Sequence, residues 1–415
     1  MISVEGGRRL ANCGAGSFDL PVQLAYDLQW FVSLNRAEAE VRARRSFSLP
    51  PICLLIVWLA AATVGQAQQG QDPAPVGQTQ RLEGEAILAL ADAAREGEPV
   101  PADFQLQWQN EFLKAQRGTF IPFTLTIDAS RLSRPVVLVY VRAVRRERAP
   151  APPRRERGRI PGRPTVSRER REPPPPDEFP VDAIFPAELQ LEPGQRARVS
   201  RGFSLAAGTY DVFVVVRERV DPAGVQAAPK AAVMTQRLDV PDFTAPGLTT
   251  SSIIVADRLE TLSRRIEPDE LPERPYVIGR NEIVPAADLR FRRNEELIVV
   301  FLIYNPFVTS EQKFDLKVEY HFFRRGTGAG DSPRGAEGQP PAQDGERYFN
   351  HTDPQRFNPA ILGSEFDPAT GQPVMAGQGI PMSGFEPGDY RLAVRVMDLL
   401  AGKSIMRDVH FTVGP

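Results

Sequence analysis

Two stretches of the chain each contain a turn glycine, a tyrosine and then a run of residues whose side chains would alternate between the two faces of a strand. This repeat constrains the fold most. The first runs from Gly208 to Val216 and the second from Gly388 to Val396. In the second stretch Tyr390 and every second residue after it favour a buried face, whereas Arg391 and Arg395 favour an exposed one. A period of two is typical of an antiparallel strand that is half buried. The repeat therefore predicts two copies of one sandwich-type domain.

The tyrosine of each repeat suggests a particular kind of sandwich. Tyr210 and Tyr390 each follow a turn glycine and lead a strand. Immunoglobulin-like sandwiches contain a tyrosine corner, in which the phenol hydroxyl bonds to nearby backbone. Gly-x-Tyr is also an ordinary way to leave a β turn, but two copies in matching context favour structural tyrosine corners.

Length and composition support an all-β protein with more than one core. A chain of 415 residues exceeds what one hydrophobic core usually serves. Its 40 prolines and 32 glycines favour a turn-rich β protein over a helical one. We therefore expect two immunoglobulin-like antiparallel β-sandwich domains in tandem, with a short N-terminal helix and two disordered insertions.

An apolar run near the N-terminus resembles an export signal. Three arginines precede the run 52–64, which is short for a membrane span, and small residues follow it up to Ala67. We expect a signal peptide over 46–67 that is cleaved after Ala67; the alternative is an uncleaved anchor at 52–64. Residues 1–45 are expected to be a non-native or unstructured extension. Cleavage would remove Cys13 and Cys53, the only cysteines, and leave a periplasmic or extracellular protein without disulfides.

The remaining chain divides by composition. Glu83 to Arg95 has the spacing of a short amphipathic helix. Two stretches, 145–178 and 326–345, are rich in proline with arginine or glycine and hold too few apolar residues to form a core, so we expect disordered insertions. The expected order is a flexible leader over 68–80, a first sandwich over 81–242, a linker over 243–248 and a second sandwich over 249–415.

The first insertion carries the strongest local charge. Its arginines outnumber its glutamates, so it could contact an anionic glycan or lipid surface, although charge runs are usually just solvated. It lacks aromatic residues for base stacking, and the net charge of −2 gives no field that attracts nucleic acid, so no nucleic-acid partner is expected. The contact candidates are Arg154, Arg155, Arg157, Arg159, Arg163, Arg168, Arg170 and Arg171.

No motif assembles a reaction centre or a cofactor site. Asp128 to Ser133 follows a strand as a metal-ion motif would, but its spacing fails, and a turn is the better interpretation. Gly326 to Gly330 lacks the helix that a phosphate-binding loop needs. His321 and His410 are expected on solvent-facing strand positions, where they could meet only if their strands are neighbours. We predict no catalytic residue, no cofactor and no metal.

Several short packing and turn motifs carry a family resemblance. The motifs are Phe120–Thr124, Pro275–Gly279, Val284–Pro285, Tyr304–Pro306, Phe349–Thr352, Phe366–Pro368 and Pro387–Tyr390 continuing to Val413. They resemble the C-terminal sandwich of exported proteins from Acidobacteria-type bacteria. Relatives in that group carry a von Willebrand A-type domain or a domain named for a Gly-Trp-x-Thr-Asp motif, and neither is evident here. The resemblance implies fold and export rather than activity.

The sequence thus predicts a non-enzymatic, exported interaction or scaffold protein of the bacterial envelope, whose partner is an envelope protein or an anionic surface. No membrane span is expected in the mature form. The alternative is an envelope carbohydrate-binding protein or hydrolase whose site is assembled from residues distant in sequence.

Overall fold

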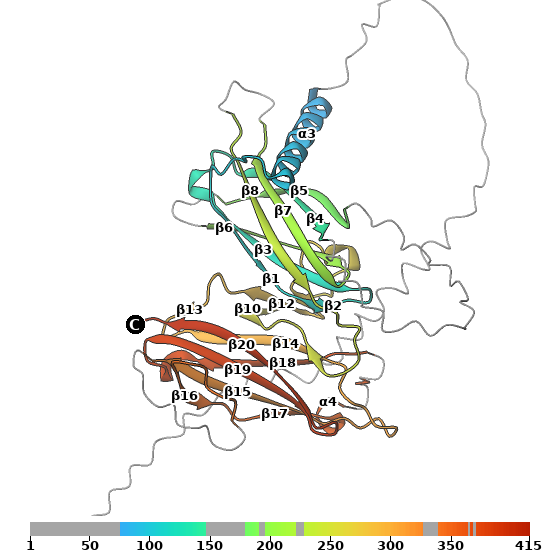
Figure 1. The fold of residues 1–415 in the computed structure, drawn as a ribbon, viewed down its shortest axis with the longest axis vertical. Coiled ribbons are helices and arrows are strands. Elements are labelled where there is room, and N and C mark those ends of the chain that lie inside the picture. The colour runs from blue at the N-terminus through green and yellow to red at the C-terminus, as the bar shows by residue number, and fades with distance from the viewer. Residues whose placement is uncertain are drawn as a thin grey trace, which may run out of the picture. The chain divides into compact units, whose positions relative to one another are not determined.

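A computed structural model describes residues 75–146, 179–190, 196–220, 228–326, 339–363, 366–367 and 371–415 (Figure 1). These residues divide into two compact units. The first domain comprises residues 75–110 and Arg117–Asp242, and the second comprises Glu111–Gln116 and Phe243–Pro415. The predicted all-β class is confirmed, because both units are built from packed, largely antiparallel sheets.

The first domain contains two sheets and one long helix. One sheet has the order β1 (Leu106–Asn110), β3 (Thr119–Asp128) and β2 (Leu113–Lys114), and β6 (Arg196–Leu205) also pairs with β3. The other has the order β5 (Val181–Glu188), β4 (Val136–Arg145), β7 (Gly208–Glu218) and β8 (Ala231–Val240). Apolar side chains of both sheets are buried, and the short 3-10 helix η2 (Ala129–Arg131) follows β3.

Helix α3 (Pro75–Glu96) covers the outer face of the second of these sheets. Ile87 and Ala91 are fully buried there against Leu138, Tyr140 and Val215. The helix is longer than the predicted 83–95, and residues 75–80 of the expected flexible leader belong to it. The buried face around Ile87 and Ala91 stabilises the part of the helix that the sequence predicted, because packing rather than propensity stabilises most helices.

The second domain is a sandwich with one core between two sheets. The first sheet has the order β11 (Val277–Ile278), β12 (Asn281–Pro285), β10 (Ile254–Thr261), β14 (Glu296–Tyr304) and β18 (Val374–Pro381), with β9 (Thr249–Thr250) beside β14. The second has the order β13 (Arg290–Phe291), β20 (Lys403–Val413), β19 (Gly388–Asp398), β15 (Leu316–Arg325) and β16 (Glu346–His351), with β17 (Gln355–Phe357) beside β15. Short helices η3 (Pro268–Glu270), α4 (Pro359–Leu362) and η5 (Met382–Gly384) complete it.

The contacts of residues 111–116 group this segment with the second domain, although in sequence it lies within the first. The backbones of Phe112 and Ser252 are joined by a 3.0 Å hydrogen bond from Ser252 N–H to the Phe112 carbonyl. The Lys114 N–H donates to the Tyr304 hydroxyl, also at 3.0 Å.

The duplicated motif occupies the same place in both domains. β7 lies between β4 and β8, as β19 lies between β15 and β20. Tyr210 pairs with Arg145 on β4, and Tyr390 pairs with Arg324 on β15. Each arginine donates to a carbonyl just before the glycine, at 3.0 Å in both cases. The repeat therefore includes an arginine on the neighbouring strand, which the motif alone did not predict.

Both motif glycines are required by the backbone. Gly208 has φ 152° and Gly388 has φ 155°, values that side chains with a Cβ rarely adopt. A Cβ at either position would also come within 3.2 Å of the guanidinium of the paired arginine. Two independent constraints thus fix glycine at the start of β7 and β19.

The outer faces of the two repeated sheets differ. In the first domain, α3 covers the apolar residues Leu138, Tyr140 and Val215. Aligning the repeat on its tyrosines places Lys317, Glu319 and Arg395 of the second domain at these three positions. In the described chain, these three residues lie under no helix and are half-buried, and we call this side of the sheet the polar face of the second domain.

Candidate functional site

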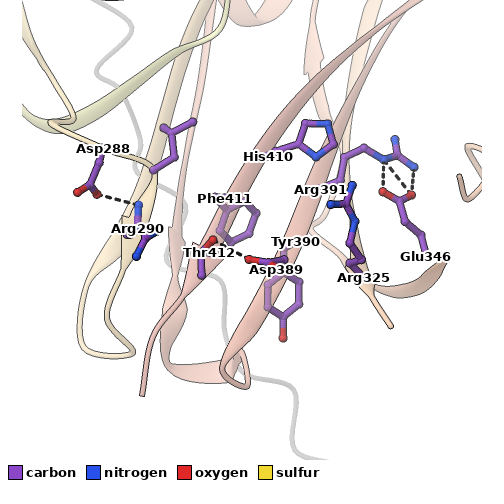
Figure 2. A pocket seen from close by; sticks show the side chains of 11 residues that line it. Asp288, Arg290, Arg325, Glu346, Asp389, Tyr390, Arg391, His410, Phe411 and Thr412 are labelled. Atoms are coloured by element: carbon purple, nitrogen blue, oxygen red, sulfur yellow. Dashed lines mark hydrogen bonds and ion pairs between the residues drawn. The ribbon is translucent and has the colours of Figure 1, made fainter. Parts of the chain in front are cut away.

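A pocket of about 450 Å³ lies on the second domain, where the ends of β13, β19 and β20 meet Arg325 of β15 and Glu346 of β16 (Figure 2). The pairing of β19 with β20 places Asp389 opposite Thr412 and Arg391 opposite His410, and all four residues line the pocket. The other lining residues that carry charge are Asp288, Arg290, Arg325 and Glu346. The pocket thus combines cationic and anionic groups.

Arg391 is the buried centre of an ionic network beside this pocket. Its guanidinium donates to the Glu346 carboxylate at 2.7–3.0 Å and to Asp408 at 2.9 Å. It also donates to the Pro341 carbonyl at 3.2 Å and lies 4.3 Å from the Phe323 ring centroid. Arg391 is 2% exposed, so its predicted place on a solvent-facing strand side was wrong. A buried cation needs such a full set of acceptors, and the segment around Pro341 provides one of them.

The segment 339–345 therefore departs from the expected disordered insertion over 326–345. Gln343 N–H donates to Glu346 at 3.0 Å, and the Gln343 amide lies 3.4 Å from Asp408. Together with the bond from Arg391 to Pro341, these contacts order the last part of the insertion over β19 and β20. Residues 327–338 lie outside the described chain.

The ionic network holds Glu346 in its charged form. Burial opposes ionisation of Glu346, but the hydrogen bonds from Arg391 and from the Gln343 backbone outweigh it and keep its pKa below the usual value. The pKa of Arg391 is raised: burial disfavours its charge, and the bonds to Glu346 and Asp408 more than compensate. A carboxylate held ionised in this way is a poor proton donor, so Glu346 is not suited to general acid catalysis.

Two other arginines of the pocket have uncommitted side chains. The guanidinium groups of Arg290 and Arg325 form no hydrogen bond or ion pair with any residue that the structure describes, and both residues are exposed. Asp288 accepts from the backbone N–H of Arg290 at 2.9 Å, and Asp389 accepts from the Thr412 hydroxyl at 2.7 Å. The carboxylates are thus engaged locally, whereas the guanidinium groups of Arg290 and Arg325 are available to an anionic group.

A second polar cluster lies on the polar face of the second domain. His321 is 6% exposed and faces His351 of β16 rather than His410, so its predicted solvent-facing position was wrong. The Tyr348 hydroxyl lies 2.9 Å from His351 Nδ1 and 3.4 Å from His321 Nδ1. His321 Nε2 lies 3.4 Å from Glu319. A polar chain of four side chains therefore crosses from β15 to β16.

A β-bulge explains why sequence periodicity missed this cluster. Tyr348 and His351 are three residues apart and would point to opposite faces of a regular strand. The register between β15 and β16 shifts between Phe322 and Phe323, which brings both side chains to one face. Phe349 packs against the core instead, with its ring centroid 5.3 Å from that of Tyr390.

The two predicted tyrosine corners have the expected hydrogen bonds. The Tyr210 hydroxyl donates to the Ala206 carbonyl at 3.0 Å, and the Tyr390 hydroxyl donates to the Glu386 carbonyl at 2.8 Å. Both spacings are four residues. Asp128 accepts from the Ser130 N–H and hydroxyl, which makes a local turn of the Asp128–Ser133 segment.

Several predicted features lie outside the described residues. They include the signal segment 46–67, the glycine-rich stretch 327–330 and the eight candidate arginines between Arg154 and Arg171. Within the described ranges, no group of three or more His, Cys, Asp or Glu side chains is arranged to hold a metal ion. Over the same ranges, the helices are too short or too polar to cross a membrane.

Comparison with known proteins gives no family assignment. No family model and no curated protein matches the chain. A mutant of Salmonella alpha-2-macroglobulin is similar over 76% of this chain and 15% of its own, at 10% identity and a TM-score of 0.19. A DUF4785 family protein from Legionella pneumophila is similar over 75% and 57%, at 8% identity and a TM-score of 0.21. The chain spans less than two thirds of either structure, and TM-scores this low carry no functional argument.

Proposed function

We propose that this is an exported, non-enzymatic interaction protein whose second domain binds an acidic group of its partner in the pocket. The observation that carries the proposal is the pair of uncommitted guanidinium groups, Arg290 and Arg325, beside a pocket of about 450 Å³. Arginine binds carboxylates and other oxyanions through paired, charge-assisted hydrogen bonds. Asp288 and Asp389 would accept from hydroxyl or amide groups near that acidic group.

The surroundings of the pocket support binding rather than catalysis. Glu346 is committed to Arg391, and the neighbouring Asp408 accepts from the same guanidinium. The export-type pattern before residue 68 supports an envelope location, and cleavage after Ala67 is part of the proposal. A mature N-terminus upstream of Ile52 in exported material would refute that cleavage.

Binding of small acids tests the pocket directly. Acetate, succinate and a sulfated disaccharide are titrated into the full chain at low salt, and backbone amide shifts are followed by NMR. We expect one of these probes to shift the NMR signals of amides that line the pocket. Its affinity should be at least about tenfold weaker for the Arg325→Gln or the Arg290→Gln variant than for the unaltered chain. Arg347→Gln is the control, because Arg347 is exposed on β16 and does not line the pocket. Equal affinity in all three variants would refute the proposal.

A further inference from the structure

The outer edge of β20 carries backbone groups that lack a strand partner. β13 pairs with β20 only at Arg290↔Thr412 and Phe291↔Val413. The Thr412 N–H donates outward, to the Leu289 carbonyl at 2.9 Å. Backbone groups alternate between the two edges of a strand, so every second residue before Thr412 also points outward. These residues are Ser404, Met406, Asp408 and His410.

Little in the described chain satisfies these outward groups. The Met406 carbonyl accepts a 3.2 Å hydrogen bond from the guanidinium of its neighbour Arg407. Otherwise the outward N–H and C=O groups from Ser404 to His410 have no hydrogen-bond partner in the ranges that the structure describes. The pairing of β19 with β20 runs without a register shift, and β20 contains no proline. Bulges and prolines protect an edge from pairing, and this edge lacks both; its charged residues are Lys403, Arg407 and Asp408.

The first domain shows that an extended segment can occupy the corresponding edge. β8 corresponds to β20, because Gly208 pairs with Val240 as Gly388 pairs with Val413. Val233 N–H donates to the Pro101 carbonyl at 3.1 Å, and Asp103 N–H donates to the Ala231 carbonyl at 3.0 Å. Aligning β8 with β20 at Val240 and Val413 places Ala231 and Val233 at the positions of Ser404 and Met406. The same edge is therefore covered in one domain and open in the other.

The pocket lies at the end of this open edge. His410 and Thr412 both line the pocket, and Leu289 and Arg290 stop the edge where β13 begins. A strand added beside Ser404 to His410 would therefore direct one end toward Arg290 and the pocket. Unpaired amides at strand spacing recognise a polypeptide backbone, which a glycan does not offer.

We propose that the outer edge of β20 binds an extended segment of a partner protein as an added strand, with a carboxylate of that segment in the pocket. The inference rests on the proposed function for the carboxylate, whereas strand addition rests on the edge itself. The carboxylate is either the C-terminus of the segment or an acidic side chain.

A peptide library with a matched pair of variants tests the inference. The probe is a display library of peptides about ten residues long with free C-termini, selected on the full chain, and the best peptide is measured by calorimetry. Met406→Pro removes an outward N–H that β19 does not use, so the fold should persist. We expect affinity for the peptide to fall at least about tenfold in Met406→Pro and less than about twofold in the control Met406→Ala. Amidated and Glu→Gln peptides identify the source of the carboxylate.

The outcomes separate the two proposals. Affinity that falls in Arg325→Gln but is unchanged in Met406→Pro would overturn strand addition and leave the pocket function standing. The reverse result would support strand addition and overturn the pocket function. Failure to select any peptide overturns strand addition.

Hydrogen exchange on the unaltered protein keeps the test valid if Met406→Pro fails to fold. The amides of Ser404 and Met406 should exchange fast in the free chain and become protected when the selected peptide is added. Protection already present in the free chain would show that the chain covers its own edge, and would overturn the inference.

Discussion

Tyr210 and Tyr390 show what one side chain contributes to each domain. Each phenol is buried and donates to a carbonyl four residues earlier, which fixes the turn that leads into the central strand. The paired arginine lies over the tyrosine ring, 5.9 Å from the centroid at Tyr210 and 6.0 Å at Tyr390. Turn, ring and arginine therefore form one unit in both domains.

Removing one corner hydroxyl should cost a single buried hydrogen bond. We expect Tyr390→Phe to lower the free energy of unfolding of the second domain by about 1 kcal/mol, because the Glu386 carbonyl loses its donor. Urea denaturation measures this loss, and hydrogen exchange at the amides of β19 reports the unfolding of the second domain. Tyr210→Phe should cost a similar amount in the first domain and leave the stability of the second domain unchanged. An unchanged free energy of unfolding in Tyr390→Phe would contradict the role of the tyrosine corner.

Arg391 should be much more costly to remove than an exposed arginine. Arg391→Leu leaves Glu346, which is 4% exposed, without its compensating cation. We expect a loss of about 3–5 kcal/mol in the free energy of unfolding. The double variant Arg391→Leu with Glu346→Leu should recover most of that loss in the same denaturation assay. A loss below about 1 kcal/mol in the single variant would argue against the network.

At the scale of elements, β15 and β16 carry a pH-dependent cluster. Burial lowers the pKa of His321, although Glu319 acts in the opposite direction. The other charged or titratable groups around His321 are Lys317, Tyr348, His351 and Arg395.

The sign of the pH effect follows from the lowered pKa. Below about pH 6.5 the unfolded chain binds a proton at His321 more readily than the folded chain, so stability should fall as pH decreases through that range. The urea midpoint of the second domain should therefore be lower at about pH 5.5 than at about pH 7.5. His321→Asn should reduce this difference, and an unchanged pH dependence in that variant would count against the buried histidine as its cause.

Helix α3 is a separable element of the first domain. Ile87 is fully buried against the sheet, whereas Leu88 on the same helix is 38% exposed. We expect Ile87→Ala to cost about 2–5 kcal/mol in the free energy of unfolding, and Leu88→Ala to cost much less. Thermal or urea denaturation of the two variants provides the comparison; equal effects would mean that α3 does not pack as described.

At the scale of the whole molecule, the chain order does not follow the division into domains. Residues 111–116 join the second domain through Phe112 and Lys114. Tyr304→Phe removes the acceptor of the Lys114 N–H, so we expect faster amide exchange over 111–116. We also expect the free energy of unfolding of the second domain to fall by about 1 kcal/mol. Mass-spectrometric exchange measures both, and unchanged exchange over 111–116 would contradict this assignment.

The sequence by itself determined the strands whose signals are local. Turn glycines, alternating apolar residues and the two tyrosines predicted β7 and β19, because the period of a strand and the φ of a turn depend on neighbouring residues only. Short strands such as β17, and β18 with its glycines, were missed because their pairing depends on distant partners.

Only the tertiary structure decided which outer positions are buried. The outer side of the repeated sheet is covered by α3 in the first domain and carries polar side chains in the second. No local pattern in β19 distinguishes a buried Arg391 from an exposed one. The pocket likewise required the ends of five strands to converge. Burial and sites depend on what packs across the sheet, and that contact comes from residues far away in the chain.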